Sequence, residues 1–178
     1  NFDIGNWDVS SATNFSFMFR GASSFNKDIG SWDVSSGTNF SWMFRNASSF
    51  NQDIGNWDLS SLSTAENMLD DCGMDISNYD ATLSGWNNNP NTQDNITLGS
   101  LNLKYCNSEA DRNNLINNKG WVINGDMKDC TGVCNLTASI TSSQDETCAS
   151  DCDGSATVSP SGGIAPYSYE WDDPNSQT

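Results

Sequence analysis

The chain has 178 residues, with seven lysines and arginines against 23 aspartates and glutamates, no histidine and a formal net charge of −16. This balance argues against nucleic acid or an anionic membrane as a partner, because both need clustered cations. The chain also lacks the commonest general base and zinc ligand, which is histidine. No run of eighteen apolar residues is present, so the sequence predicts no membrane insertion.

The N-terminal third of the chain repeats itself at a fixed interval. The segments DIGNWDVSS, DIGSWDVSS and DIGNWDLSS follow one another, with their tryptophans at Trp7, Trp32 and Trp57. A fixed period of this size is typical of a solenoid, in which one unit stacks on the next. The related segment DISNYDATL (75–83) follows at a shorter offset. It predicts a fourth coil, with Tyr79 and Asp80 in the places of Trp57 and Asp58.

Each coil is expected to contain a short strand, a turn and a short helix. In the first coil, Ile4, Trp7 and Val9 suit a half-buried strand. The following segment TNFSFMFRGA places Phe, Met and Ala side chains on one helical face. Stacked strands would form a parallel sheet, and each coil would cover the core of its neighbour. The predicted repeat core comprises Ile4, Trp7, Val9, Phe15, Met18, Phe19, Ile29, Trp32, Val34, Phe40, Met43, Phe44, Ile54, Trp57 and Leu59.

The coils are expected at about 1–25, 26–50, 51–74 and 75–94, with a C-terminal cap over 95–130. Within the cap, NITLGSLNLKYC reads as a strand region, SEADRNNLINNKG as a helix between Ser108 and Gly120, and WVI as a last strand. The fold class is therefore α/β. The chain opens in mid-repeat with no N-terminal cover, which suggests a fragment or a processed product.

The segment 131–178 has a different texture. It contains no lysine or arginine, and it alternates as strands do in SATVS and YSYEW, with a Gly-Gly-x-x-Pro turn between them. It is shorter than half of the roughly 100 residues that a β-sandwich needs. We therefore expect an incomplete β-sandwich module, whose missing strands come from continuing polypeptide or from a neighbouring chain.

Two family resemblances follow from these motifs. The pattern FNxDIGxWDVSSxTNFSxMFRxAS, with NYDATLSGW, LKYC and GWVINGD after it, resembles the short tandem repeat of bacterial surface proteins, a relative of BspA-like leucine-rich repeats. This resemblance covers 1–130. The later Cys152, the DGS that follows it and GGIAPYSYEW resemble the immunoglobulin-like SprB-type repeat of gliding-motility adhesins. Together they imply a secreted or surface-anchored protein with a leucine-rich-repeat-like solenoid, an immunoglobulin-like module and no catalytic site.

Six cysteines favour disulfides over a zinc site, because zinc pairs usually lie two residues apart. A bond between Cys106 and Cys130, which bracket the predicted capping helix, would staple the end of the solenoid. The first cysteine of the second segment could pair with either of the other two there. The earliest cysteine is left without a named partner. The candidates are Cys72, Cys106, Cys130, Cys134, Cys148 and Cys152.

The aspartates after each tryptophan form the sharpest candidate site. If Asp8, Asp33, Asp58 and Asp80 stack about 5 Å apart, the repulsion between neighbours is about 3 kcal/mol at an effective dielectric near 20. A row of Ca²⁺ ions would relieve it, since calcium favours carboxylate oxygens. The alternative, which we favour, is that each carboxylate accepts backbone N–H bonds within its own turn. No cofactor is then required, and calcium remains possible.

Phe17 and Trp42 lie off the predicted buried stripe, one coil apart. As an exposed aromatic ladder they could contact glycans or a partner protein. The alternative, which we favour, is that they pack on the adjacent coil or under a missing cap. Arg20 and Arg45 recur beside them and could pair with carboxylates.

These observations favour a non-enzymatic extracellular protein, an adhesin or appendage component that works by multivalent display. Its expected partners are other copies of itself, surface glycans or surface proteins. The alternative is a subunit of a self-assembling extracellular filament, joined head to tail or by strand donation. A polysaccharide-active enzyme is less favoured, because columns of carboxylates offer a flat row rather than a paired acid and base in a cleft.

Overall fold

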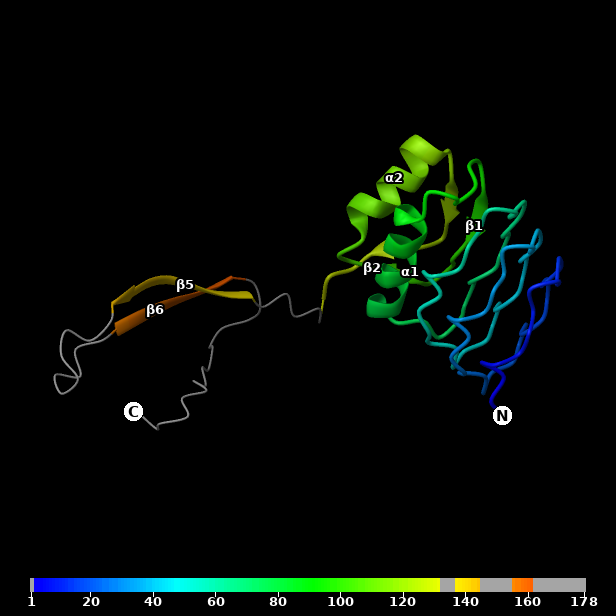
Figure 1. The fold of residues 1–178 in the computed structure, drawn as a ribbon, viewed down its shortest axis with the longest axis horizontal. Helices are drawn as coiled ribbons and strands as arrows, with labels where there is room; N and C mark the ends of the chain where they lie inside the picture. Colours follow the sequence, from blue (N-terminus) through cyan, green and yellow to red (C-terminus); the bar gives the residue numbers. More distant parts are fainter. Residues whose placement is uncertain (1, 132–136, 145–154, 162–178) are drawn as a thin grey trace. The chain divides into compact units, whose positions relative to one another are not determined.

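The computed structural model describes residues 2–131, 137–144 and 155–161 (Figure 1). The chain divides into two compact units, Asn1–Thr131 and Gly132–Thr178. The first unit is mixed α/β with small parallel sheets. It begins with three coils of turns, drawn side by side from blue to cyan-green in Figure 1. The helices and strands of this unit follow the coils.

In the first unit, each helix is followed by two short strands. They are α1 (Ile76–Asn88), β1 (Thr97–Gly99), β2 (Lys104–Tyr105), α2 (Glu109–Lys119), β3 (Val122–Asn124) and β4 (Met127–Lys128). β1 pairs with β3 and β2 pairs with β4, both in parallel. In the second unit, β5 (Thr137–Gln144) and β6 (Ser155–Ser161) pair antiparallel.

Main-chain hydrogen bonds join each coil to the next along one edge. The amide of Phe15 donates to the carbonyl of Asn39 (2.8 Å), and the amide of Phe17 donates to that of Ser41 (3.1 Å). The second coil bonds to the third at the equivalent positions, where the amide of Phe40 donates to the carbonyl of Thr64 (2.9 Å). Every second amide along this edge therefore points to the next coil, which is the spacing of a strand ladder.

The intervening amides bond within their own coil and make turns where a helix was predicted. The amide of Met18 donates to the carbonyl of Phe15 (3.2 Å), three residues back rather than four. Phe17 and Trp42 have φ angles of 63° and 66°, in the left-handed region that a right-handed helix excludes. The predicted helix is wrong because an i, i+4 spacing such as that of Phe15 and Phe19 fits a period of two as well as a period of 3.6.

The strand predicted around each tryptophan is also absent from the first three coils. The carboxylate of Asp3 accepts the amide of Gly5 (3.0 Å), and that of Asp8 accepts the amide of Ser10 (3.1 Å). The amide of Trp7 donates to the carbonyl of Ile4 (3.0 Å). These local bonds bend the backbone, because short polar side chains compete with the sheet for main-chain donors.

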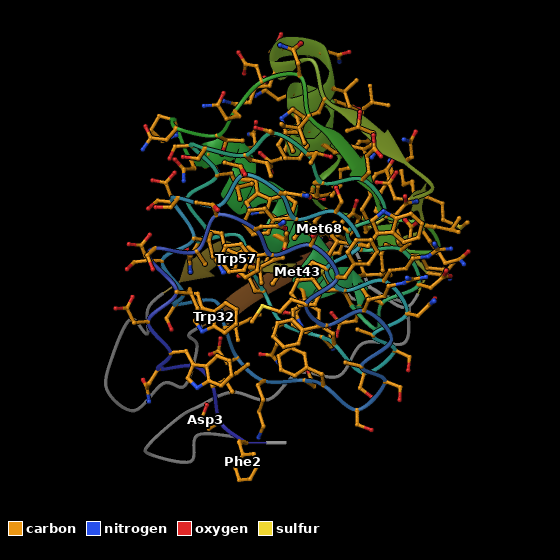
Figure 2. The ribbon with its side chains drawn as sticks, turned by 90° about the vertical axis from the view of Figure 1, so that its right-hand side faces the viewer. Phe2, Asp3, Trp32, Met43, Trp57 and Met68 are labelled. Atoms are coloured by element: carbon orange, nitrogen blue, oxygen red, sulfur yellow. A yellow bond between two sulfur atoms is a disulfide. The ribbon has the colours of Figure 1, made fainter. Side chains whose placement is uncertain are left out.

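Trp32 and Trp57 nevertheless bind the preceding coil in the same way, as the repeat requires. The indole N–H of Trp32 donates to the carbonyl of Ile4 (3.0 Å), and that of Trp57 donates to the equivalent isoleucine carbonyl one coil later (3.0 Å). Both rings are buried, so this bond satisfies a donor that would otherwise be stranded. Viewed along the stack, Trp32 and Trp57 lie on one side of the interior, with Met43 and Met68 beside them (Figure 2).

Burial of the predicted repeat core depends on position along the stack. Val9 and Phe19 are half-buried and pack against the core. Trp7 and Met18 differ from the prediction, with exposed fractions of 55% and 41%. Both belong to the first coil, and no coil precedes it in the part of the chain that the structure describes. The buried members are Ile4, Phe15, Ile29, Trp32, Val34, Phe40, Met43, Phe44, Ile54, Trp57 and Leu59.

The expected fourth coil is a helix, α1. Asp75 caps its start by accepting the amide of Asn78 (2.9 Å). Trp86, near the end of α1, continues the tryptophan column by donating to the carbonyl of Ile54 (3.0 Å). Tyr79 does not occupy the place of Trp57, as the sequence match predicted. Its side chain is buried, and its hydroxyl donates to the carboxylate of Asp126 (3.0 Å).

The C-terminal part of the first unit contains the predicted capping helix as α2, which ends at Gly120 in the left-handed conformation (φ 68°). A disulfide joins Cys106 to Cys130, with the Cα atoms 4.9 Å apart. This is the pair that brackets α2. Cys72 has no disulfide partner among the residues that the structure describes. The other cysteine candidates, Cys134, Cys148 and Cys152, lie outside the described residues.

Candidate binding surface

An aromatic–arginine ladder lies across the first two coils and consists of Phe17, Arg20, Trp42 and Arg45. The rings of Phe17 and Trp42 are nearly parallel, with an interplanar angle of 16° and centroids 5.8 Å apart. The Arg20 guanidinium carbon lies 5.5 Å from the Phe17 centroid and 5.1 Å from the Trp42 centroid. That of Arg45 lies 4.4 Å from the Trp42 centroid. These are cation–π distances.

The main-chain ladder puts these side chains in register. The amide of Trp42 donates to the carbonyl of Glu66 (2.9 Å), just as the amide of Phe17 donates to that of Ser41. Equivalent side chains therefore lie one above another at each step. Phe17 is 51% exposed and Trp42 is half-buried. The two rings thus pack on each other and still reach the surface, so the structure combines features of both sequence alternatives.

The arginines of the ladder do not form the carboxylate pairs that the sequence suggested. Among the described residues, neither Arg20 nor Arg45 is within ion-pair distance of an aspartate or glutamate. The buried Nε of Arg45 has no hydrogen-bond acceptor in the described part of the chain. The sequence contains no acidic residue between Asp8 and Asp28, or between Asp33 and Asp53. Both guanidiniums therefore keep in-plane donors available for an external acceptor.

A polar pocket lies one coil further on, next to the ladder. It has a volume of about 400 Å³ and is lined by Glu66, Asn67, Asp70, Thr97 and Asn124, among others. Asn67 and Asp70 stand one repeat after Trp42 and Arg45, so they occupy the same columns. Sequence reasoning missed this pocket, although the offset of the repeat could have located those two residues.

The buried Asp70 carboxylate organises this pocket. One oxygen accepts the amide of Leu101 (2.9 Å), and the other accepts the side-chain amide of Asn67 (2.7 Å). Asn67 has a φ of 54°, like Phe17 and Trp42 in the same column. The backbone of the column is thus uniform while its side chains change from aromatic to amide.

The aspartate column consists of turn braces in the first three coils. The Asp33 carboxylate accepts both the amide (3.1 Å) and the hydroxyl (2.6 Å) of Ser35, and Asp8 does the same with Ser10. Asp58 accepts the amide of the serine two residues on (2.9 Å). The serine hydroxyl is the main cause, and the serine amide the second, that lowers the pKa of Asp8 and of Asp33.

Asp80 does not join this column. It is buried, and its carboxylate accepts the amides of Cys106 (3.0 Å), Asn107 (2.8 Å) and Ser108 (3.2 Å). The Ser108 hydroxyl also donates to Asp80 (2.6 Å) rather than capping α2. Within residues 2–131, no three aspartates, glutamates or cysteines gather as a metal-binding cluster. The calcium row stays a prediction, now restricted to Asp8, Asp33 and Asp58.

Stacked coils with a repeated surface column define a repeat protein rather than a protein built around one pocket. The chain belongs to the family described as Mycoplasma protein of unknown function, DUF285, which matches residues 1–98. Residues 140–176 match the SprB repeat. These matches confirm both resemblances seen in the sequence, the first over a shorter span than 1–130.

The remaining comparisons add little. No curated protein and no solved structure matches the chain. Neither matched family description names a reaction. Across the residues that the structure describes, none of the helices has the length and apolar character needed to cross a membrane. Together, the two family matches indicate a repeat protein of the surface or adhesin type.

Proposed function

We propose that this chain is part of a non-enzymatic extracellular adhesin that presents a leucine-rich-repeat-like solenoid to surface glycans or proteins. The SprB match and the disulfide support an extracellular location, because disulfides persist mainly in oxidising compartments. Stacked coils that share one hydrogen-bonding edge support the solenoid.

The observation that carries this proposal is the aromatic–arginine ladder. Its rings stand one coil apart with partly exposed surfaces, on an edge where the backbone bonds repeat in register. One such site is small and would bind weakly. Many copies presented together would multiply the affinity without any new contact.

The test compares one copy with several. The chain would be biotinylated at its C-terminus and applied to a glycan array as the monomer and as a streptavidin tetramer. We expect the tetramer to be retained on a subset of glycans that the monomer barely binds. A parallel assay for released reducing sugar should stay at background. Retention of neither form on any glycan would contradict adhesion to glycans, and sugar release would contradict a non-enzymatic role.

A second candidate is a filament subunit, favoured by exposed aromatic side chains of the first coil. Phe2 is 91% exposed and Trp7 is 55% exposed. The indole of Trp7 has no acceptor among the described residues, whereas that of Trp32 has the Ile4 carbonyl. Electron microscopy of the purified chain should then show ordered fibres that Trp7→Glu abolishes. A monodisperse monomer at high concentration would contradict this candidate.

We propose that the coils need no metal cofactor. The bonds from Ser10 and Ser35 to the aspartate carboxylates support this, since they already stabilise the charge. The melting temperature should be the same in EDTA and in millimolar Ca²⁺. A melting temperature that rises with Ca²⁺, and loses the rise in Asp33→Asn, would instead support the calcium row.

A further inference from the structure

We propose that the aromatic–arginine ladder and the adjoining polar pocket together bind an acidic oligosaccharide in which a uronic acid is linked to a neutral sugar. The sugar carboxylate would lie on Arg20 and Arg45, and the hydroxyls of the neighbouring sugar would enter the pocket beside Asn67. This inference rests on the proposed adhesive function and names the class of glycan.

The ladder provides the anion site. A guanidinium stacked on a ring keeps its N–H donors at its rim, where they match a carboxylate in a bidentate way. Arg20 and Arg45 stack on Trp42 and have no carboxylate partner among the described residues. The buried Nε of Arg45 still lacks an acceptor. In a chain with a net charge of −16, two unneutralised cations side by side are a local exception.

Backbone conformation gives a second, independent reason. Phe17 and Trp42 hold a left-handed conformation that bulky side chains rarely adopt. Asn67, in the same column, shows that asparagine satisfies this position at less strain. Phe17 is 51% exposed, so its burial offsets little of that strain. Strain of this kind collects at ligand sites, where the side chain is retained for contact.

The pocket explains why the ligand has a neutral sugar next to the acidic one. Its lining offers amide, hydroxyl and carboxylate groups from Asn67, Thr97 and Glu66, which suit sugar hydroxyls. Glu66 and the buried Asp70 would repel a second carboxylate. The order of charges along this face, cationic and then acidic, therefore sets the register of an alternating saccharide.

The experiment measures binding of the chain to hyaluronan hexasaccharide, an alternating uronic acid and N-acetyl sugar, by isothermal titration calorimetry. The matched probe is the same hexasaccharide with its carboxylates methyl-esterified. We expect the acidic probe to bind at least tenfold more tightly than the ester. Its affinity should also fall as NaCl rises, because an exposed charge pair is screened by salt.

Three variants separate the parts of the site. Arg20→Gln/Arg45→Gln should lose at least tenfold in affinity for the acidic probe. Trp42→Asn, which copies the residue in the next coil, should lose affinity while keeping the same melting temperature. Lys27→Gln removes a cation outside the ladder and is the charge control, so its affinity should match that of the parent chain.

The outcomes distinguish this inference from the proposed function. Equal binding of the acid and its ester, or unchanged binding by the arginine double variant, overturns the acidic-saccharide site. If the tetramer still retains other glycans on the array, adhesion survives and only the ligand class is wrong. No binding to the hexasaccharide together with an empty array overturns both.

Discussion

The aspartate that follows each tryptophan illustrates what one residue can and cannot reveal in a repeat. Asp8, Asp33 and Asp58 recur at the period of the coil, and recurrence alone fits a metal ligand as well as a turn. The serine two residues later distinguishes them, because its amide and hydroxyl lie within reach of the carboxylate. The role of these aspartates as turn braces could therefore be predicted from the sequence.

The position of Cys72 in the repeat explains its role, which the sequence left open. It stands one repeat after Ala47, a fully buried small side chain in the preceding coil. Cys72 packs against the same core, and burial raises the pKa of its thiol to about 11. Cys72 therefore serves as a small apolar side chain of the core, which explains why the sequence offered no disulfide partner for it.

The aspartate turns give a pH dependence at the scale of single residues. The pKa values of Asp8 and Asp33 are lowered in the folded chain, so their contribution to stability is present above the unfolded pKa of about 3.9. It is lost as the pH falls through the folded values. We expect the melting temperature to drop below about pH 4. In Asp8→Asn/Asp33→Asn, the drop should be shallower.

The control for this prediction is Asp94→Asn, because Asp94 is exposed and accepts no hydrogen bond from the described residues. Its melting curve should follow that of the parent chain at every pH. If the melting temperature of the double variant falls with pH as steeply as that of the parent chain, protonation of these aspartates does not affect the stability of the turns.

At the scale of elements, sequence reasoning failed within the coils, where turns replace the predicted strand and helix, and again at the boundary between coils and helices. The segment around Tyr79 and Asp80 matches the repeat in letters, yet it is a helix that Asp75 caps. The shorter offset of this segment from the coil before it was the available signal that the coil pattern ends there. The capping helix α2 was predictable, because Gly120 ends it and apolar strands flank it. The acceptor for the amides that precede α2 could not be predicted, because Asp80 lies 26 residues before Cys106.

Asp80 joins α1 to the start of α2. Asp80→Ala would remove the carboxylate that accepts the amides of Cys106 and Ser108, two buried residues. We expect a loss of about 3 kcal/mol in the free energy of unfolding. Urea titration followed by tryptophan fluorescence measures it. Asp80→Asn keeps one carbonyl oxygen and should lose less, and a loss as small as in Asp94→Ala would contradict this role.

The disulfide fastens the same part of the unit. Cys106 and Cys130 close a loop with a sequence separation of 24 residues around α2. Cys106→Ser/Cys130→Ser should lower the free energy of unfolding by about 3 kcal/mol, because the unfolded chain regains the freedom of that loop. The parent chain with a reducing agent should approach the same value. If reduction leaves the urea midpoint unchanged, the bond is dispensable for stability.

At the scale of the whole unit, a residue's contribution depends on its place in the stack. Equivalent tryptophans go from 55% exposed at Trp7 to 4% at Trp32 and 0% at Trp57. The sequence predicted the column but not this gradient, because burial requires a coil on each side. The fixed period could not locate Trp86, because it lies inside helix α1. It could not locate Trp121 either, which follows helix α2 and whose ring lies beside that of Trp86.

The gradient predicts unequal effects of the same substitution. Trp57→Ala should cost about 4 kcal/mol, since it empties a fully buried site and removes the indole bond to the Ile29 carbonyl. Trp7→Ala should cost less than about 1 kcal/mol, as expected for an exposed side chain. Thermal unfolding of both variants provides the comparison. Equal losses would mean that the first coil is covered in solution.

Along the edge that contains the ladder, the bonds between coils are made by the main chain, so they do not depend on which side chains point outward. One column already contains Phe17, Trp42 and Asn67 on the same backbone. The backbone geometry of such an edge stays the same when its outward side chains change. We expect that whole coils can be duplicated or deleted in steps of one period. The outward side chains of each coil can also be substituted, while the spacing between equivalent positions stays the same. A lineage that carries this scaffold can therefore change what its surface recognises without having to evolve a new fold.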